Sequence, residues 1–380
     1  MIRCTRCVMP STRPDTEFVD GVCSACLAYE RRPEIDWAAR RGELEALLER
    51  GRNASGYDCI VPSSGGKDSH YQVLTVLELG ARPLVVTATT CQLTGIGRRN
   101  IENLRRYATT IEVSPNATAR AALNRIGLEL VGDISWPEHA GIFTTPFRIA
   151  AALGIPLLLY GENPQNQYGG PMEATEARQM TRRWVSEFGG FLGLRPMDCV
   201  GQQGLTERDM QDYMMPSPEA LAAAGVEAHF LGQYLPWDSH ANAKRAREAG
   251  MVQVLPCHAN VWNHENLDNA QTGLHDHGMY RKYGYGRACA QLSVDIRSRR
   301  IDRPWAMQQL AWRDGEFPHT YMGTQLETVL ERLERPLKWL MENLDRHTNW
   351  ALFSGVQAGK PVLKEFASAK TDGFQKTTTA

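Results

Sequence analysis

The stretch from Asp58 to Ser69, Asp-Cys-Ile-Val-Pro-Ser-Ser-Gly-Gly-Lys-Asp-Ser, constrains the fold more than any other part of this chain. It begins with a short apolar run, Cys59 to Val61, which is typical of a buried strand. A turn with two adjacent glycines follows, and a helical pattern then continues to Leu79. A strand, a glycine turn and a helix N-terminus together present free backbone N–H groups to an anion. The stretch therefore predicts a phosphate-binding turn at the end of a strand.

This turn does not have the spacing of a Walker-type loop. That motif places four residues between its first glycine and its Gly-Lys-Ser/Thr end, whereas here the glycines are adjacent and Asp68 separates Lys67 from Ser69. The hexapeptide Ser-Gly-Gly-Lys-Asp-Ser instead resembles the pyrophosphate loop of the ATP pyrophosphatases, which cleave ATP to AMP and pyrophosphate. The resemblance implies adenylation of a substrate oxygen, followed by displacement of AMP by a nucleophile. The alternative is a serine–glycine turn without a ligand.

Strands alternate with helices after the loop. Further strands are expected at 83–88, 110–113, 155–160 and 228–232, with intervening helices at 97–106, 117–132 and 137–153. This alternation predicts an α/β fold with a parallel sheet and right-handed crossovers. The resemblance adds that the sheet is Rossmann-like and of the adenine nucleotide alpha hydrolase type.

Ligands of such sheets bind at the carboxyl ends of the strands. The loop, Thr87 and the segment Tyr160-Gly-Glu-Asn163 all fall there. The residues expected to bind ATP are Ser63, Ser64, Gly65, Gly66, Lys67, Asp68, Ser69, Thr87 and Asn163. The residues expected to be catalytic are Lys67, Asp68 and Glu162. For Glu162 and Asn163, capping of the next turn is the alternative.

Four cysteines near the N-terminus have the spacing of a metal site. Cys4-x-x-Cys7 and Cys23-x-x-Cys26 can place four thiolates at the corners of a tetrahedron, which Zn²⁺ prefers in a closed structural site. A segment this short lacks a core of its own, so the metal would supply its folding free energy. We expect structural Zn²⁺. A redox or iron–sulfur site and unliganded cysteines are the alternatives, whereas catalytic zinc needs an open position that four cysteines do not leave.

Composition limits the class of protein. The 380 residues contain 42 Lys and Arg against 43 Asp and Glu, so the net charge of −1 gives no general signature of nucleic-acid binding. No apolar run approaches the roughly 18 residues of a membrane span, and the first residues do not resemble a signal peptide. Nine cysteines, an odd number, argue against a disulfide framework. We expect a cytoplasmic protein without a membrane partner.

Four regions are expected along the chain. They are a zinc ribbon at 1–32, the nucleotide-binding domain at 33–260 with an irregular insertion at about 164–225, a helical substrate or cap region at 261–366, and a flexible tail at 367–380. A helix from Trp37 to Gly51, capped by Asp36, should cover the nucleotide domain. Residues 325–353 read as two amphipathic helices that are divided at Pro336.

A second informative stretch contains His275-Asp-His277 and Lys282-Tyr-Gly-Tyr-Gly-Arg287. Two histidines in a loop, without further matched ligands, are weak evidence for a metal. A glycine-rich turn with Lys282 and Arg287 could instead hold a phosphate or a carboxylate of a substrate. For Arg287, which begins a helical run, a surface role is the alternative.

Taken together, these segments resemble the N-acetyl sugar amidotransferase family of bacterial surface-polysaccharide biosynthesis. The likeness covers residues 3 to 345. It is carried by Cys-Thr-Arg-Cys-Val-Met-Pro10 with Gly-Val-Cys-Ser-Ala-Cys26, the loop that ends at Ser69, Leu-Tyr-Gly-Glu-Asn163, Leu-Gly-Gln-Tyr-Leu-Pro-Trp-Asp238, the 275–287 segment and Asp295-Ile-Arg297.

The resemblance implies that ATP activates the acetamido carbonyl of a nucleotide-linked N-acetyl sugar as an adenylate. Ammonia from a separate glutaminase subunit then displaces AMP and leaves an acetamidino group. In this scheme Ser64 to Ser69 hold the pyrophosphate end of ATP and Asp68 helps to place Mg²⁺. The substrate side is lined by His275, Asp276, Lys282 and Arg287. The family pattern has an aromatic residue near His277 and a lysine near Met279; this chain differs there, which leaves the sugar, or the class of acceptor, open.

Two rival functions remain at this stage. Enzymes that insert sulfur use the same loop with reactive cysteines, and Cys91 and Cys199 would serve a thiolation of a small molecule or RNA. Cys59 lies in a buried strand pattern and is expected to be inert. The third class is a zinc-ribbon binding module with an inactive nucleotide fold. The sequence leaves the oligomeric state open, and a homo-oligomer is compatible with it.

Overall fold

A five-stranded parallel sheet forms the centre of the molecule. The computed structural model describes residues 1–52, 56–256, 259–357 and 359–367. The strands are β3 (Cys59–Pro62), β4 (Pro83–Ala88), β5 (Thr109–Val113), β6 (Leu157–Tyr160) and β7 (Glu227–Phe230), in the order β5-β4-β3-β6-β7. The predicted α/β class is confirmed. The strand order reverses between β3 and β6, which creates a crevice at their carboxyl ends.

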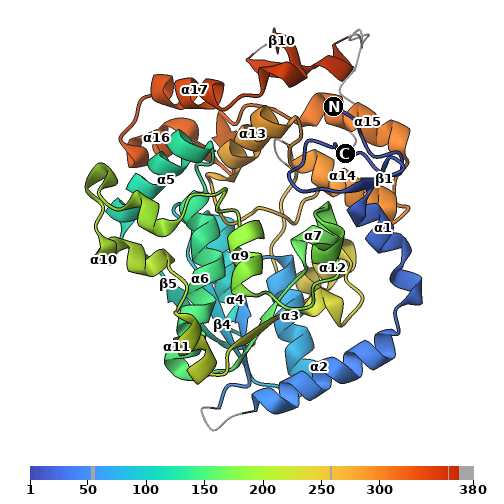
Figure 1. Ribbon diagram of the computed structural model, residues 1–380, viewed down its shortest axis with the longest axis vertical. Coiled ribbons are helices and arrows are strands. Elements are labelled where there is room, and N and C mark those ends of the chain that lie inside the picture. Colours follow the sequence, from blue (N-terminus) through green and yellow to red (C-terminus); the bar gives the residue numbers. More distant parts are fainter. Residues whose placement is uncertain (53–55, 257–258, 358, 368–380) are drawn as a thin grey trace.

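Helices cover both faces of this sheet (Figure 1). Successive strand residues point to opposite faces, so Val61 and Leu159 pack in one core while Ile60 and Leu158 pack in the other. The first core includes residues of α2 (Trp37–Gly51), α3 (Lys67–Glu78) and α4 (Gly95–Leu104). The second includes residues of α6 (Trp136–Leu153), α9 (Arg182–Phe188) and α11 (Pro218–Ala223). Among the described residues, no helix combines the length and the apolar character that crossing a membrane requires.

The remaining helices of the nucleotide domain flank these layers. α5 (Ala117–Val131) packs against α6, and α12 (Ser239–Glu248) packs against α3. The insertion at 164–225 is less irregular than expected, because it also contains the short helices α7 (Pro164–Tyr168), α8 (Met172–Thr175) and α10 (Glu207–Met210).

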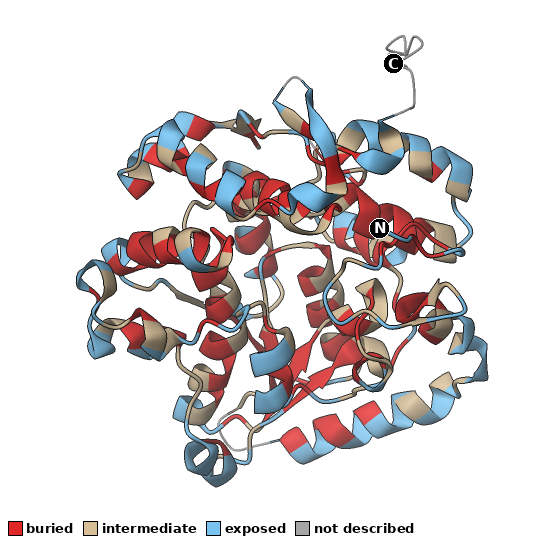
Figure 2. Ribbon diagram, turned by 45° about the horizontal axis from the view of Figure 1, so that its top comes forward, coloured by how far each residue is buried: buried red, intermediate tan, exposed pale blue. Residues whose placement is uncertain are grey.

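The C-terminal region lies across the carboxyl ends of the strands as an upper layer (Figures 1 and 2). Its helices are α13 (Thr272–Tyr283), α14 (Arg287–Arg297), α15 (Arg303–Arg313), α16 (Leu326–Leu333) and α17 (Leu337–Arg346). Two hairpins complete it, β8 (Thr320–Tyr321) with β9 (Thr324–Gln325), and β10 (Phe353–Gln357) with β11 (Lys360–Leu363). Pro336 divides α16 from α17, as the sequence predicts, whereas the second hairpin was not predicted.

The expectation of a loop around His275 and His277 is wrong, because both residues lie within α13. This helix buries polar side chains, Asp276, His277 and Arg281, beside Leu274. Its buried face therefore lacks the apolar residues at every third or fourth position by which an amphipathic helix is recognised in a sequence.

The N-terminal ribbon consists of β1 (Phe18–Val19), β2 (Val22–Cys23) and α1 (Ser24–Glu30). Its cysteines share a cluster of buried residues with Cys289 and Leu292 of α14 and with Leu310 of α15. The ribbon thus packs on the C-terminal region, although the two are separated by most of the sequence (Figure 1).

Candidate active site

The loop after β3 is built for a close approach of phosphate. Gly65 has a φ of 81° and a Cβ there would lie 2.8 Å from Ile101 Cγ1, so both conformation and space require glycine. Gly66 is the N-cap of α3, and no side chain caps the helix there. The hydroxyl oxygens of Ser63 and Ser69 accept hydrogen bonds from the backbone N–H groups of Gly65 and Ser64, which shape the turn. The start of α3 thereby faces the crevice.

Lys67 is the buried cation at the centre of the site. Its Nζ lies 2.6 Å from Asp68 Oδ2 and 2.9 Å from Glu265 Oε1. Burial opposes the charged form, but the carboxylates of Asp68 and Glu265 raise the pKa of Lys67 well above its usual range. The lysine is therefore a fixed point charge next to the loop.

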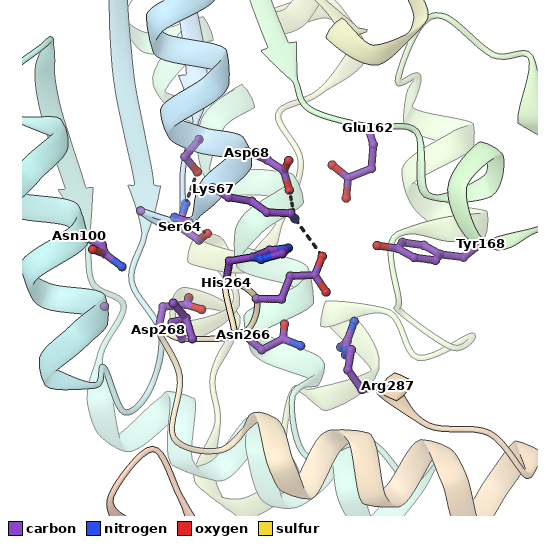
Figure 3. A pocket seen from close by; sticks show the side chains of 16 residues that line it. Ser64, Lys67, Asp68, Asn100, Glu162, Tyr168, His264, Asn266, Asp268 and Arg287 are labelled. Carbon is purple, nitrogen blue, oxygen red and sulfur yellow. Dashed lines mark hydrogen bonds and ion pairs between the residues drawn. The ribbon is translucent and has the colours of Figure 1, made fainter. Parts of the chain in front are cut away.

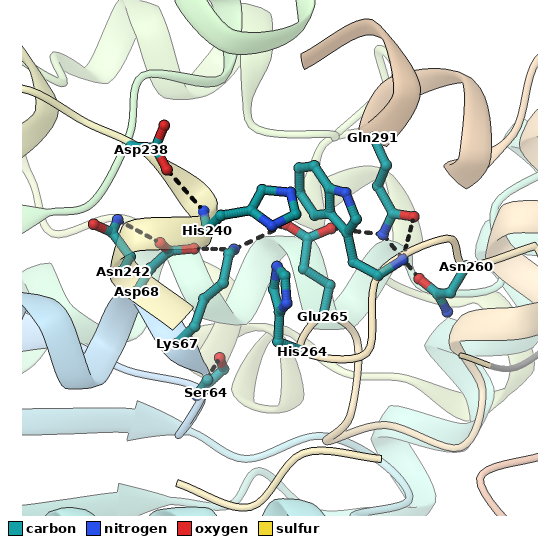
Figure 4. Close-up of polar contacts among 12 residues, drawn as sticks. Ser64, Lys67, Asp68, Asp238, His240, Asn242, Asn260, His264, Glu265 and Gln291 are labelled. Carbon is teal, nitrogen blue, oxygen red and sulfur yellow. Dashed lines mark hydrogen bonds and ion pairs between the residues drawn. The ribbon is translucent and has the colours of Figure 1, made fainter. Parts of the chain in front are cut away.

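A polar network holds the two carboxylates (Figure 4). Asn242 Nδ2 donates to Asp68 Oδ1 at 3.1 Å, and Gln291 Nε2 donates to Glu265 Oε2 at 2.9 Å. Although burial opposes it, the charges of Lys67 and Arg287 lower the pKa of Glu265 to about 2. The network joins α3 and α12 of the nucleotide domain to α14 of the upper layer.

A cavity of about 220 Å³ opens beside this network. Figure 3 shows Glu162 and Tyr168 pointing toward Lys67 from the wall opposite the loop. Glu162 comes just after the end of β6, separated from it by Gly161, and lies across the crevice from the loop that follows β3. Burial, together with the neighbouring charge of Asp68, raises the pKa of Glu162 to about 7. A carboxyl group of this kind can accept or donate a proton near neutral pH.

Arg287 closes the far side of the cavity. It is the first residue of α14, and Asp276 of α13 holds its guanidinium by two hydrogen bonds of 2.9 and 3.3 Å. With Nε and Nη2 bonded to Asp276, the guanidinium of Arg287 is held in place in the wall of the cavity (Figure 3). A braced guanidinium is suited to a phosphate or a carboxylate.

Several lining residues were not assigned from the sequence. They come from the segment between α12 and α13 and from α4 and α7, and they are Gly97, Asn100, Tyr168, His264, Glu265, Asn266, Leu267 and Asp268. Burial lowers the pKa of His264 to about 4 and raises that of Asp268 to about 6. The segment Trp-Asn-His-Glu-Asn-Leu-Asp268 is rich in polar residues, but its sequence has no periodicity that indicates which of them face the cavity.

The structure brings together only part of the predicted set. Ser64 to Ser69, Glu162 and Arg287 line one cavity, whereas Ser63, Thr87 and Asn163 do not. Asn163 caps α7 through a bond from Gln165 N, and its amide donates to Ala174 O and Ala177 O. The capping alternative therefore accounts for Asn163.

His275 and Lys282 lie outside this cavity. His275 Nδ1 is 2.8 Å from Asp133 Oδ1, and Lys282 Nζ donates to Val131 O. His277 projects from α13 on another side, where its ring packs edge-on against Phe317. The two histidines thus do not converge on one ligand, because residues two apart on a helix face different directions.

The four ribbon cysteines do converge. Their sulfur atoms lie within 4.8 Å of one another and all four residues are buried. Cys4 Sγ is 3.9 Å from Cys26 Sγ, and Cys7 Sγ is 3.7 Å from Cys23 Sγ. Tetrahedral zinc with bonds of about 2.3 Å would place the sulfur atoms about 3.8 Å apart. The donor set therefore fits Zn²⁺.

The cysteines outside the ribbon are poorly suited to nucleophilic chemistry. None of Cys59, Cys91, Cys199 and Cys289 lines the cavity, and Cys257 lies outside the described residues. Burial raises the pKa of Cys91 well above its usual range and that of Cys199 to about 11. Both residues are therefore thiols rather than reactive thiolates near neutral pH.

Comparisons with known proteins bear on the C-terminal region. Residues 260–364 match the model of the C-terminal domain of WbpG-like LPS biosynthesis proteins. NMN synthetase from Francisella tularensis aligns over 58% of this chain and 99% of its own, with 11% identity and a TM-score of 0.25, which is too low to carry an argument. No curated protein sequence matches the chain. The family match supports the resemblance stated above, and it includes Glu265 and Arg287 of the candidate site.

Proposed function

We propose that this chain is an ATP-dependent, AMP-forming amidotransferase that converts the acetamido group of a nucleotide-linked N-acetyl sugar into an acetamidino group. The observation that carries the proposal is the cavity in which a pyrophosphate-loop cation, Lys67, faces a braced guanidinium, Arg287. The first belongs to an ATP site and the second lies in the region that matches an LPS biosynthesis domain. Both features support an ATP-using enzyme of polysaccharide biosynthesis.

In the first step, the acetamido oxygen attacks the α-phosphorus of ATP and pyrophosphate leaves. The loop N–H groups and Lys67 face the position where negative charge grows on the leaving group, and fixed donors of this kind stabilise a transition state. Asp68, whose carboxylate lies at the edge of the cavity, offers oxygen ligands for Mg²⁺, which would neutralise phosphate charge.

In the second step, ammonia attacks the activated carbon, the C–O bond breaks, and AMP leaves with the former acetamido oxygen on its phosphate. The attacking nitrogen must lose a proton, and Glu162 would accept it; this role is supported by its position in the cavity wall and by burial, which raises its pKa to about 7. Ammonia would come from a glutaminase partner. Holding it beside the adenylate supplies proximity.

Thiolation is less well supported, because it needs a reactive thiolate near the activated carbon. Among the described cysteines outside the ribbon, Cys59, Cys199 and Cys289 are buried and Cys91 is half-buried, and none of the four lines the cavity. We expect Cys91→Ser and Cys199→Ser to retain product formation. Loss of activity in a folded variant of either kind would favour the thiolation function.

The direct test is mass spectrometry of the products formed from ATP, Mg²⁺, ammonium chloride and a panel of nucleotide-linked N-acetyl sugars. A product about one mass unit lighter than its substrate, with equimolar AMP and pyrophosphate, is expected because NH replaces O. Asp68→Ala should fold but release no pyrophosphate. AMP release without the mass change, or a product about sixteen units heavier with a sulfur donor, would overturn the amidine assignment.

A further inference from the structure

Asp133, His139 and His275 form a second cluster of metal-ligating side chains, separate from the ribbon. Asp133 lies in the connection between α5 and α6, His139 in the first turns of α6, and His275 in the first turns of α13. One ligand atom from each lies within 4.8 Å of the other two. None of the three residues lines the cavity of the candidate active site.

Asp133 makes a contact of a different kind with each histidine. His275 Nδ1 lies 2.8 Å from Asp133 Oδ1, a hydrogen-bond distance. His139 Nδ1 lies 3.3 Å from Asp133 Oδ2, yet this buried nitrogen has no hydrogen-bond partner among the described residues. Ligand atoms around zinc, with bonds of about 2.0–2.1 Å, are about 3.3–3.5 Å apart. The 3.3 Å between His139 Nδ1 and Asp133 Oδ2 is therefore the spacing of two ligand atoms on one ion.

The surroundings hold these three side chains in place. The two imidazole rings meet nearly at right angles, at 80°, with centroids 4.9 Å apart. Asp133 is 6% exposed, and its Oδ1 also accepts a hydrogen bond from Ser135 N. Gly190 has a φ of 77° and lies next to His139, where a Cβ would be 2.8 Å from His139 Nδ1. A larger residue at position 190 would therefore displace the imidazole ring.

We infer that Asp133, His139 and His275 bind a divalent transition-metal ion such as Zn²⁺. Two imidazoles and one carboxylate are a donor set for ions of this class, whereas Mg²⁺ and Ca²⁺ favour oxygen ligands alone. Three protein ligands leave at least one coordination position for water or for a substrate oxygen. His275 precedes Asp276, which braces Arg287, so the ion would lie close to the wall of the candidate active site. The inference stands whether or not the amidine chemistry is correct.

The test is metal titration of the full chain whose ribbon is already loaded with one Zn²⁺. Wild-type protein should bind a second Zn²⁺ per chain, counted by elemental analysis after dialysis. With Co²⁺ as the probe, the second site should lack thiolate-to-cobalt charge transfer, which only the four-cysteine site can give. His139→Ala should weaken the second site more than about tenfold. His319→Ala, which removes an exposed histidine outside the cluster, is the matched control.

Two results would overturn the inference. One is a wild-type chain that binds a single ion, at the ribbon, which would mean that Asp133 merely pairs with two histidines. The other is a His139→Ala variant that binds the second ion as tightly as wild type. The number of ions bound by the wild-type chain is measured without any variant, so the inference can still be tested if His139→Ala fails to fold.

Discussion

Lys67 shows how single residues set the properties of the site. A buried ammonium is stable only when it is paired, because its hydration is lost on folding. Lys67 meets two carboxylates, one from its own helix and one from Glu265, 198 residues away. The same side chain therefore provides the positive charge of the phosphate site and links the nucleotide domain to the C-terminal region.

We expect Lys67→Met to lower the free energy of unfolding by about 3–5 kcal/mol, because it leaves the carboxylate of Glu265 without its cation and beside the like charge of the half-buried Asp68. The double variant Lys67→Met, Glu265→Gln should recover part of that loss, because the negative charge that Lys67→Met leaves unpaired at Glu265 is then removed. Denaturant-induced unfolding of the wild type, both single variants and the double variant measures the coupling. If the losses in unfolding free energy of the two single variants add up to that of the double variant, Lys67 and Glu265 do not pair directly.

Glu162 is a carboxyl group whose charged form is destabilised in the folded chain. Its pKa is about 7 in the folded chain against 4.5 for an ordinary glutamate. Below pH 4.5 the carboxyl is protonated in both the folded and the unfolded chain, so it contributes no pH dependence. Between about 4.5 and 7 the unfolded chain releases the proton while the folded chain keeps it. The free energy of unfolding therefore falls as pH rises through this window.

Glu162→Gln should remove this dependence. The variant should match the wild type in stability near pH 4 and exceed it above pH 7, by a margin on the order of 3 kcal/mol. Unfolding curves for both proteins at several pH values measure the difference. A difference that stays constant from pH 4 to 8 would show that the carboxyl titrates normally. If Glu162 accepts the proton of ammonia, the variant should also lose amidine formation.

At the scale of elements, the ribbon supports the turn that presents Arg287. Thr12 Oγ1 donates to Tyr283 O, and Arg13 Nη1 donates to Tyr285 OH at 3.1 Å. Arg13 Nε also donates to Gly169 O, just after α7, which carries Tyr168. Two walls of the cavity are thus tied to a segment whose own folding free energy would come from a metal.

Cys4→Ser is expected to lower zinc content and thermal stability together, and to raise KM for the sugar substrate through loosening of the turn at Arg287. Elemental analysis, thermal unfolding and steady-state kinetics measure these three effects. Cys91→Ser is the matched control, because it makes the same substitution outside the ribbon. A Cys4→Ser variant with normal zinc stoichiometry would remove Cys4 from the ligand set.

At the scale of the whole molecule, the two ends of the described chain are joined. Arg3, whose side chain is 4% exposed, pairs with Glu365 through hydrogen bonds of 2.9 and 3.0 Å from its Nε. Tyr280 OH donates to Pro361 O at 2.8 Å, which fixes β11 against α13. The ribbon and the C-terminal hairpin therefore enclose α13 and α14 from two sides (Figure 1).

Glu365→Gln should lower the free energy of unfolding by about 1–3 kcal/mol, because the buried guanidinium of Arg3 loses a charged partner. Thermal unfolding of the zinc-loaded chain measures this loss. Glu30→Gln, which removes the partner of the exposed Arg6, is the control and should leave stability unchanged. Equal stability of the two variants would show that the ends of the chain do not support one another.

The features that could be predicted from the sequence are encoded locally. The loop from Ser63 to Ser69, the alternation of strands and helices, and the two Cys-x-x-Cys pairs each lie within a short span, where spacing and period specify geometry. They were sufficient for the parallel sheet and for the convergence of four cysteines.

Which distant side chains meet depends on the packing of the folded chain and could not be predicted from the sequence. Glu265 comes to Lys67 from a segment without regular period, and His275 meets Asp133 across 142 positions instead of pairing with His277. α13 could not be predicted because several of its buried positions are polar, such as Asp276, whose partner Arg287 lies outside the helix. Periodicity reports only whether a face is apolar, whereas the partner of a buried charge is set by how the layers pack.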